Sequence, residues 1–242
     1  MKIGRFLNGG KVVEGRIEDG EVVTKSDERL KIKDLKYLSP VNPSKIICVG
    51  LNYVDHAKEL DMELPHEPIL FLKAPSAVIG HEDIVRYPRT TQKLDHEAEL
   101  AIVIGKKCKE VKAEDAYDVI EGYTCFNDLT ARDLQKLNMQ WTRAKSFDTF
   151  APIGPHIVTK DEIDPSNLNI KMLVNGEIRQ DSNTKNLIFD VPSLIEFISE
   201  IMTLNPEDII STGTPPGIGP VKKGDEMEVK IEGIGTLRNR VS

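Results

Sequence analysis

The pattern of apolar and polar residues along this chain predicts strands more often than helices. Residues 1–39 alternate β-forming residues with Gly-containing turns, which is typical of short strands joined by tight connections. Prolines at positions 40 and 43 then mark a linker. We therefore expect a small N-terminal β domain over residues 1–42 and a main domain over residues 43–242.

The main domain is predicted to have a β-rich core with peripheral helices. Asn175 and Gly176 suit the positive φ angles of a type I′ turn, so a hairpin is expected around them. Asp190 is the expected N-cap of an amphipathic helix. Strands are expected at 45–50, 68–80, 94–106, 167–182, the start of 208–221 and 225–241; helices at 51–62, 112–123 and 190–204; and a strand turning into a helix at 123–138. This order is not an alternating βαβ series, so the predicted fold class is α+β, mainly β.

Composition excludes several classes of partner. The net charge of -7 argues against a nucleic-acid surface and provides no basic face for an anionic membrane. No window approaches the roughly 20 apolar residues of a membrane span, and the first residues lack the apolar core of a signal peptide. Cys48, Cys108 and Cys125 show no metal-ligand spacing. We expect reduced thiols in a cytoplasmic protein with no nucleic-acid or membrane partner.

The strand predicted at 94–106 places two carboxylates beside an almost unbroken apolar run. Since successive strand residues point to opposite faces, Glu97 and Glu99 share a face with Ala101. Two like charges at this spacing repel, and burying either one unpaired is costly. The pair is explained either by a cation between the carboxylates or by an edge strand whose charged face meets water.

Asp128 is the candidate third ligand for such a cation. It lies where an apolar strand gives way to a helix, a position at which sites are often built. Three carboxylates suit Mg²⁺ or Mn²⁺, which prefer oxygen donors, whereas Zn²⁺ would more often recruit His or Cys. The alternative role for Asp128 is the N-cap of a helix that begins near Thr130.

A histidine and a glutamate form a second candidate pair. If residues 51–62 are helical, His56 and Glu59 are neighbours on one face. A carboxylate bonded to one imidazole nitrogen leaves the other nitrogen free as a general base. The alternative is a surface ion pair without function. His96 points to the strand face opposite Glu97, so we do not expect it to be a ligand.

Lys145 and the Gly- and Pro-rich loop at 212–219 are candidates for contact with a substrate. Lys145 is flanked by residues of strand character, where a buried ammonium could bind an acidic substrate or stabilise an enolate. A surface lysine with its ammonium in water is the alternative. The loop can bring backbone N–H groups close to a ligand, although a plain tight turn has the same composition. It lacks the P-loop signature, so phosphate is not expected.

Seven ordered segments together resemble the fumarylacetoacetate hydrolase family, in the branch of acylpyruvases, oxaloacetate decarboxylases and hydroxymuconate-type isomerases. The segments are CVGLNYVDHAKEL, PILFLKAPSAVIG, LDHEAELAIVIGK, GYTCFNDLTARDLQ, WTRAKSFDTFAPIGP, VNGEIRQDSNT and DIISTGTPPGIGPVKKGD. The resemblance implies a mixed β-roll of packed sheets, a small N-terminal domain and pairing into a homodimer.

The resemblance also implies a role for each candidate residue. The implied roles are Mg²⁺ or Mn²⁺ ligands for Glu97, Glu99 and Asp128; a catalytic dyad, ordered when a lid closes, for His56 and Glu59; a catalytic lysine for Lys145; and substrate binding for Arg132, Gln135, Gly213 and Thr214.

The implied substrate is a 2-oxo acid or 1,3-diketo acid that reacts through an enolate stabilised by the metal. Hydrolysis of a C–C bond, as in acylpyruvases, or decarboxylation is the first expectation. Isomerisation or tautomerisation of a hydroxymuconate-type dienoate is the alternative on the same site. Two rivals come from other classes: a metal-dependent protein that binds keto acids without turnover, and a structural carboxylate cluster without metal.

Overall fold

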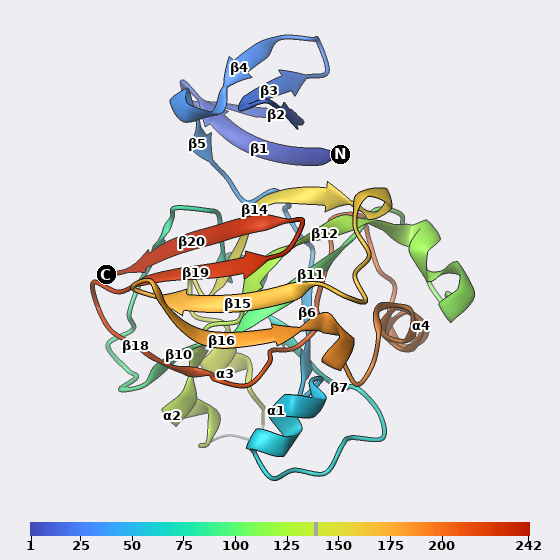
Figure 1. Ribbon diagram of the computed structural model, residues 1–242, viewed down its shortest axis with the longest axis vertical. Coiled ribbons are helices and arrows are strands. Elements are labelled where there is room, and N and C mark those ends of the chain that lie inside the picture. Colours follow the sequence, from blue (N-terminus) through green and yellow to red (C-terminus); the bar gives the residue numbers. More distant parts are fainter. Residues whose placement is uncertain (138–139) are drawn as a thin grey trace.

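The computed structural model describes residues 1–137 and 140–242, and strands dominate its regular structure (Figure 1). The predicted mainly β class with peripheral helices is confirmed. The strands of the largest sheet, in spatial order, are β4 (Arg29–Lys31), β3 (Glu21–Thr24), β2 (Lys11–Glu18), β1 (Lys2–Asn8), β14 (Ala151–Thr159), β12 (Ile120–Asn127), β11 (Ala98–Ile104), β17 (Ile209–Ser211), β6 (Ile46–Gly50) and β7 (Ile69–Lys73), with β5 (Lys36–Tyr37) on β1 and β8 (Val78–Ile79) on β14.

Two smaller sheets complete the fold. The first consists of β16 (Glu177–Asn183), β15 (Asn169–Val174), β19 (Glu226–Ile231), β20 (Gly235–Val241) and β9 (Ile84–Val85), and the second of β13 (Thr130–Ala131), β10 (Leu94–His96) and β18 (Gly219–Val221). β15 packs against β11, and β19 packs against β12. Burial alternates along β15 and β19, so one face of each points into the core between the sheets.

The central strand β11 is buried along its whole length. It lies between β12 and β17, and its residues from Leu100 to Ile104 form the continuous apolar run that is typical of a strand covered on both faces. The strand is therefore not at an edge, and the solvent-facing alternative for its glutamates is wrong.

The helices are short and lie around the sheets. They are α1 (Val54–Glu59), α2 (Arg132–Gln135), α3 (Thr142–Lys145) and α4 (Val191–Ile201), with 3₁₀ turns η1 (Ile32–Asp34), η2 (Pro75–Ala77), η3 (Ala113–Val119), η4 (Lys160–Glu162) and η5 (Thr184–Asn186). Figure 1 shows α1, α2 and α3 together at the lower end of the view, far from the N-terminal strands.

Two local features predicted from the sequence, a hairpin turn and a helix N-cap, are present in the structure. Asn175 and Gly176 have φ angles of 53° and 81° and join β15 to β16, which confirms the hairpin. The Asp190 carboxylate accepts a hydrogen bond from the Ser193 backbone N–H at 2.9 Å, which confirms the N-cap of α4.

Two predicted helices differ from the structure. Residues 112–123 form η3 followed by the start of β12, because pairing of Ile120 with Ile104 on β11 favours a strand there. In the segment 123–138, the predicted strand that turns into a helix is present, but β13 of another sheet lies between β12 and α2, and the helix is shorter than expected. Residue 138, the last of that prediction, lies outside the described residues.

The N-terminal strands β1 to β5 confirm the short strands predicted for residues 1–39. They stand apart from the rest of the chain in Figure 1, yet β1 pairs with β14 at Lys2–Val158 and Ile3–Ile157. The N-terminal strands thus extend the main sheet. The division of the chain at residue 42 stays a prediction.

The remaining expectations concern location and assembly. Within residues 1–137 and 140–242, no helix is both long and apolar enough to cross a membrane. Cys48, Cys108 and Cys125 are free thiols. The homodimer and the cytoplasmic location stay predictions.

Candidate active site

Three carboxylates converge where β11 begins and β12 ends. Glu97 precedes β11, Glu99 lies within it, and Asp128 follows β12. Antiparallel pairing sets Ala98 opposite Asn127, and the Asp128 backbone N–H donates to the Glu97 carbonyl at 2.9 Å. One oxygen of each carboxylate lies within 4.8 Å of the others, and the three residues are 5%, 2% and 0% exposed. Pairing of the two strands thus brings Asp128 to two glutamates that precede it by 29 and 31 positions, and the three form one buried acidic cluster.

Lys145 is part of this cluster. Its ammonium donates to Glu97 Oε2 at 2.9 Å and to Asp128 Oδ2 at 2.5 Å. Lys145 is 2% exposed and lies in the short helix α3, so both the surface alternative and the predicted strand character are wrong. Asp128 does not cap a helix, since α2 has Ala131 at its N-cap position. Burial alone would lower the pKa of Lys145, but Asp128 and Glu97 outweigh it and raise that pKa.

A second buried lysine was missed by the sequence reasoning. Lys73, the last residue of β7, is 1% exposed and forms an ion pair with Asp128 Oδ1. Its ammonium also donates to the Leu129 carbonyl at 3.0 Å. The available signal was a lysine at the end of the apolar run ILFLK, because a lysine is almost never buried without an anionic partner. Both oxygens of Asp128 are therefore held by lysines.

Arg132 and Gln135 act together beside Glu97. The Arg132 guanidinium forms an ion pair with Glu97 Oε1, donates to Asp95 at 2.9 Å, and donates to Gln135 Oε1 at 2.7 Å. The two residues lie three positions apart on α2, which places their side chains on one face. The guanidinium thus already interacts with three side chains of the protein, and its contact with Glu97 holds that carboxylate in position.

The two glutamates have opposite electrostatic surroundings. Burial alone would raise the pKa of Glu97, but Lys145 and Arg132 outweigh burial and hold it below its usual value. Burial raises the pKa of Glu99 well above its usual value, and the neighbouring Asp128 and Glu97 raise it further. Among the described residues, no Lys or Arg forms an ion pair with Glu99, which accepts hydrogen bonds only at Oε2.

The donors to Glu99 Oε2 are the Ser211 hydroxyl at 2.5 Å and the Gly213 backbone N–H at 3.0 Å. The donor set fits a hard divalent cation, because three clustered carboxylates offer oxygen ligands and Glu99 has no positive partner of its own. Such a cation would provide the positive partner that Glu99 lacks.

The predicted pair on α1 is present. The imidazole Nδ1 of His56 lies 2.8 Å from Glu59 Oε2, and Glu59 Oε1 accepts a hydrogen bond from the Gly217 backbone N–H at 3.1 Å. His56 is 6% exposed, so its pairing with Glu59 is not a contact between two surface side chains. α1 is held in place by Asp55, which accepts hydrogen bonds from the Ser182 hydroxyl at 2.5 Å and from Asn186 at 3.1 Å.

The loop at 212–219 has a conformation that requires glycine at position 213. Gly213 has φ +92°, and a Cβ there would lie 2.9 Å from Asn52 Cβ and 3.0 Å from the Val49 carbonyl. Thr214 donates to the Ala98 carbonyl at 2.9 Å and accepts from Gln180 at 2.8 Å. Its hydroxyl hydrogen is therefore used within the protein. The plain tight turn is not an adequate description, because Gly213 also contacts Glu99.

Gln180 is a second residue that the sequence reasoning missed. Its Oε1 accepts from the Ala98 backbone N–H at 2.9 Å and lies 3.2 Å from His96 Nδ1, while its Nε2 donates to Thr214 and to the Pro215 carbonyl at 2.7 Å. It thereby ties the loop to the start of β11. His96 is not part of the cluster of Glu97, Glu99 and Asp128, and that it is not a metal ligand stays a prediction.

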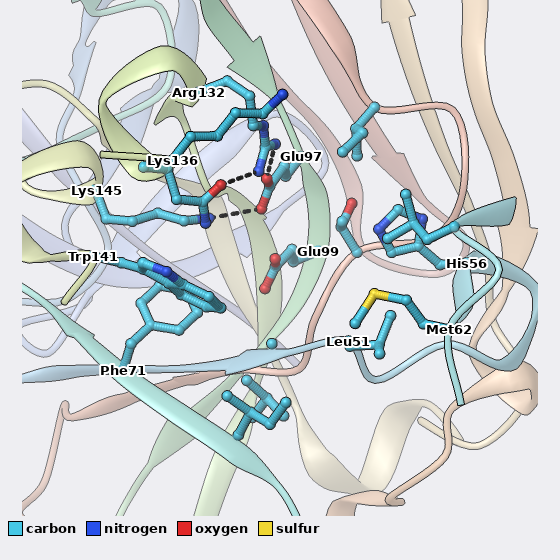
Figure 2. Close-up of a pocket in the computed structure, with 17 residues that line it drawn as sticks. Leu51, His56, Met62, Phe71, Glu97, Glu99, Arg132, Lys136, Trp141 and Lys145 are labelled. Atoms are coloured by element: carbon cyan, nitrogen blue, oxygen red, sulfur yellow. Dashed lines mark hydrogen bonds and ion pairs between the residues drawn. The ribbon is translucent and has the colours of Figure 1, made fainter. Parts of the chain in front are cut away.

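A cavity of about 500 Å³ brings the candidate residues together (Figure 2). Its lining includes the predicted residues His56, Glu97, Glu99, Arg132, Gln135, Lys145 and Thr214. The other three predicted residues stand directly behind this lining: Asp128 contacts Lys145, Glu59 contacts His56, and Gly213 contacts Glu99. Figure 2 shows His56 on the right, across the cavity from Lys145, with the two glutamates between them.

Comparison with known proteins identifies the family. The family model of the fumarylacetoacetate hydrolase C-terminal domain matches residues 45–242. The chain belongs to the fumarylacetoacetate hydrolase family. Enzymes of this family include isomerases, tautomerases and hydrolases, and they use divalent metals.

Three relatives show the range of activities. The mitochondrial oxaloacetate tautomerase of Xenopus laevis is 47% identical over 223 residues, which are 88% of this chain and 70% of that protein. The structure of a 5-carboxymethyl-2-hydroxymuconate delta-isomerase from Mycobacterium smegmatis is similar with TM-score 0.93 and 43% identity, covering 100% of this chain and 98% of the other. A maleylpyruvate hydrolase from Sphingobium sp. SYK-6, in complex with manganese(II) and pyruvate, has TM-score 0.84 and 32% identity over 100% and 98% of the two chains.

Proposed function

We propose that the protein interconverts the keto and enol forms of a small 2-oxo acid, with oxaloacetate as the first substrate to test. The observation that carries this proposal is the His56–Glu59 pair on one side of a cavity whose other side holds Glu97, Glu99 and Lys145. A base that faces a lysine and a group of carboxylates able to hold a cation suits removal of a proton next to a carbonyl. The relatedness to an oxaloacetate tautomerase supports the same reaction.

The proposed cofactor is a divalent cation held by Glu97, Glu99 and Asp128. When bound, it would act as a Lewis acid that draws electrons from the 2-oxo group of the substrate. Mg²⁺ and Mn²⁺ both suit three oxygen donors, and the manganese complex of the maleylpyruvate hydrolase supports this class of ion.

The protein's own residues would move the proton. The bond from Nδ1 to Glu59 leaves Nε2 of His56 as the nitrogen that takes the proton from C3 of the substrate. The C3–H electron pair becomes the C2–C3 double bond, the 2-oxo oxygen takes the electrons of the carbonyl π bond and gains a proton from the solvent, and His56 returns the proton from C3 to the solvent. Lys145 provides positive charge for the oxygen that gains electrons, an effect worth about 2–4 kcal/mol for a well-placed donor. Arg132 and Gln135 orient the site by fixing Glu97.

C–C bond hydrolysis of a 2,4-dioxo acid is the second candidate. The cavity of about 500 Å³ has room for a substrate larger than a four-carbon acid. In this reaction His56 would activate water, the C3–C4 bond would break, and pyruvate would leave as its enol. The relatedness to a maleylpyruvate hydrolase supports this candidate. Acetylpyruvate and oxaloacetate therefore belong in the same assay, with pyruvate release reporting hydrolysis or decarboxylation.

The test is the decay of enol-oxaloacetate absorbance with wild-type protein and with His56→Ala. The proposal predicts accelerated decay without pyruvate release for the wild type, and loss of roughly 10²- to 10⁴-fold of that rate in the variant. His66→Ala is the matched control, because His66 is exposed and lies outside the cavity. Equal rates for His56→Ala and wild type would contradict the assigned role.

A further inference from the structure

The part of the cavity beyond the charged residues is lined by large apolar side chains. We propose that this apolar wall binds an uncharged, flat or branched tail on a 2-oxo acid, and that the enzyme therefore prefers such substrates to those with a second carboxylate on an extended tail. The inference rests on the proposed function and extends it to a class of substrate. The apolar wall consists of Val49, Leu60, Met62, Ile69, Phe71 and Trp141.

Several residues of the apolar wall are unusually exposed. Leu60, Met62 and Ile69 are 46%, 52% and 42% exposed, although each is a large apolar side chain. They come from the end of α1, the segment after it and β7, yet all three line the cavity that contains Glu97. Exposed apolar groups that converge on a pocket are typical of a ligand-binding surface. Because the apolar wall and Glu97 line one continuous cavity, the occupant that we infer for the wall is the tail of a substrate whose 2-oxo acid group reacts beside Glu97.

Trp141 provides a flat surface on this wall. Its ring meets the Phe71 ring edge-on, with centroids 5.2 Å apart and an interplanar angle of 69°. Trp141 packs over Gly50, where a Cβ would lie only 3.2 Å from the indole, so the glycine makes room for the ring. The Lys145 ammonium lies 4.8 Å from the centre of the Phe71 ring. The apolar wall therefore begins directly beside the group that would face the reacting oxygen.

Among the described residues that line the cavity, Lys145 is the one cation beside this wall, at the Phe71 ring. Among the described residues, the lysines and arginines that line the cavity are Arg132, Lys136 and Lys145. Arg132 and Lys145 already form ion pairs with the acidic cluster. Figure 2 shows Lys136 beside Arg132, on the opposite side of the carboxylates from Phe71 and Trp141. A second carboxylate placed along the wall would lose water without gaining a partner, which is costly.

The test compares 2-oxo-4-phenylbutanoate with 2-oxoglutarate, which share the 2-oxo acid head and differ in the tail. Proton exchange at C3 in heavy water, followed by NMR, measures turnover of both, and oxaloacetate serves as the substrate without an extended tail. We expect kcat/KM for the phenyl compound to exceed that for 2-oxoglutarate by roughly 10-fold or more. Trp141→Ala should lower kcat/KM for the phenyl compound by roughly 10- to 100-fold while changing the oxaloacetate rate far less.

A charge placed on the wall gives a second, opposite test. Ile69→Lys should raise kcat/KM for 2-oxoglutarate, because the new ammonium can pair with its tail carboxylate. Leu72→Lys is the matched control on the same strand, since Leu72 is similarly exposed at 46% but does not line the cavity. An equal gain in both variants would contradict the inference.

Trp141 also offers a readout that does not depend on turnover. It is the chain's single tryptophan, so its fluorescence reports contact with the wall directly. The phenyl compound should change this fluorescence and 2-oxoglutarate should not. Oxaloacetate turnover without a preference between the two tails would overturn this inference and leave the proposed function intact. Tail-selective fluorescence without any turnover would support the wall and overturn the proposed function.

Discussion

Replacement of Lys73 by methionine tests the electrostatic balance of the acidic cluster. Lys73 is 1% exposed, and its ammonium is shared between Asp128 and the Leu129 carbonyl. Methionine has a similar length and no charge, so the change removes the cation without leaving a large cavity. Asp128 then keeps Lys145 as its only ion-pair partner among the described residues.

The expected loss is about 3–5 kcal/mol of the free energy of unfolding, the usual cost of removing one partner from a buried ion pair. The assay is guanidinium denaturation of chelator-treated protein, followed by circular dichroism. Saturating Mg²⁺ should recover part of the loss, because the ion supplies positive charge to the same carboxylates.

Lys45→Met is the control for this measurement. Lys45 also forms an ion pair with a buried aspartate, Asp208, but its side chain is 21% exposed, and Asp208 keeps the Ser44 hydroxyl and the Asn205 backbone N–H as donors. We expect a loss of about 1 kcal/mol there. A loss in Lys73→Met below about 1 kcal/mol would refute the reasoning, because it would mean that Asp128 does not need its second cation.

Three further predictions separate metal binding, proton transfer and stability. Glu99→Ala should abolish both Mg²⁺ binding and turnover, whereas His56→Ala should keep its Mg²⁺ affinity in calorimetric titration; normal binding by Glu99→Ala would contradict the site. Glu59→Ala should lower kcat by roughly 10- to 100-fold with unchanged Mg²⁺ affinity, since His56 loses its partner; an unchanged kcat would count against the dyad. Burial lowers the pKa of His156 to about 4, and the unfolded chain titrates near 6.5, so the unfolded state binds the proton more readily. Stability present above pH 6.5 should therefore fall by up to about 3 kcal/mol as the pH drops to 4, and denaturation of His156→Gln across this range should show a flatter profile.

Local patterns were sufficient to predict much of the fold. The apolar run that became β11, the turn at Asn175 and Gly176, and the cap at Asp190 each depend on neighbouring residues in the sequence. The helix expected at 112–123 failed because its second half pairs with β11, a tertiary contact that outweighs helix propensity.

In the candidate site, too, the residue pairs that depend on local spacing could be predicted, and the contacts that depend on tertiary structure could not. His56 and Glu59 could be paired from helical spacing, and Glu97 and Glu99 from strand alternation. Lys73 could not be placed, because its partner Asp128 lies 55 positions away and reaches it only through the sheet. The apolar wall around Trp141 was hidden for the same reason.

The measurement that tests the central claim most directly is turnover of enol-oxaloacetate by chelator-treated protein as Mn²⁺ or Mg²⁺ is added back. The account predicts that the chelated protein is inactive and that activity returns in step with metal binding to Glu97, Glu99 and Asp128. Full activity in the presence of chelator would contradict it, because the carboxylate cluster would then serve the structure and not the reaction.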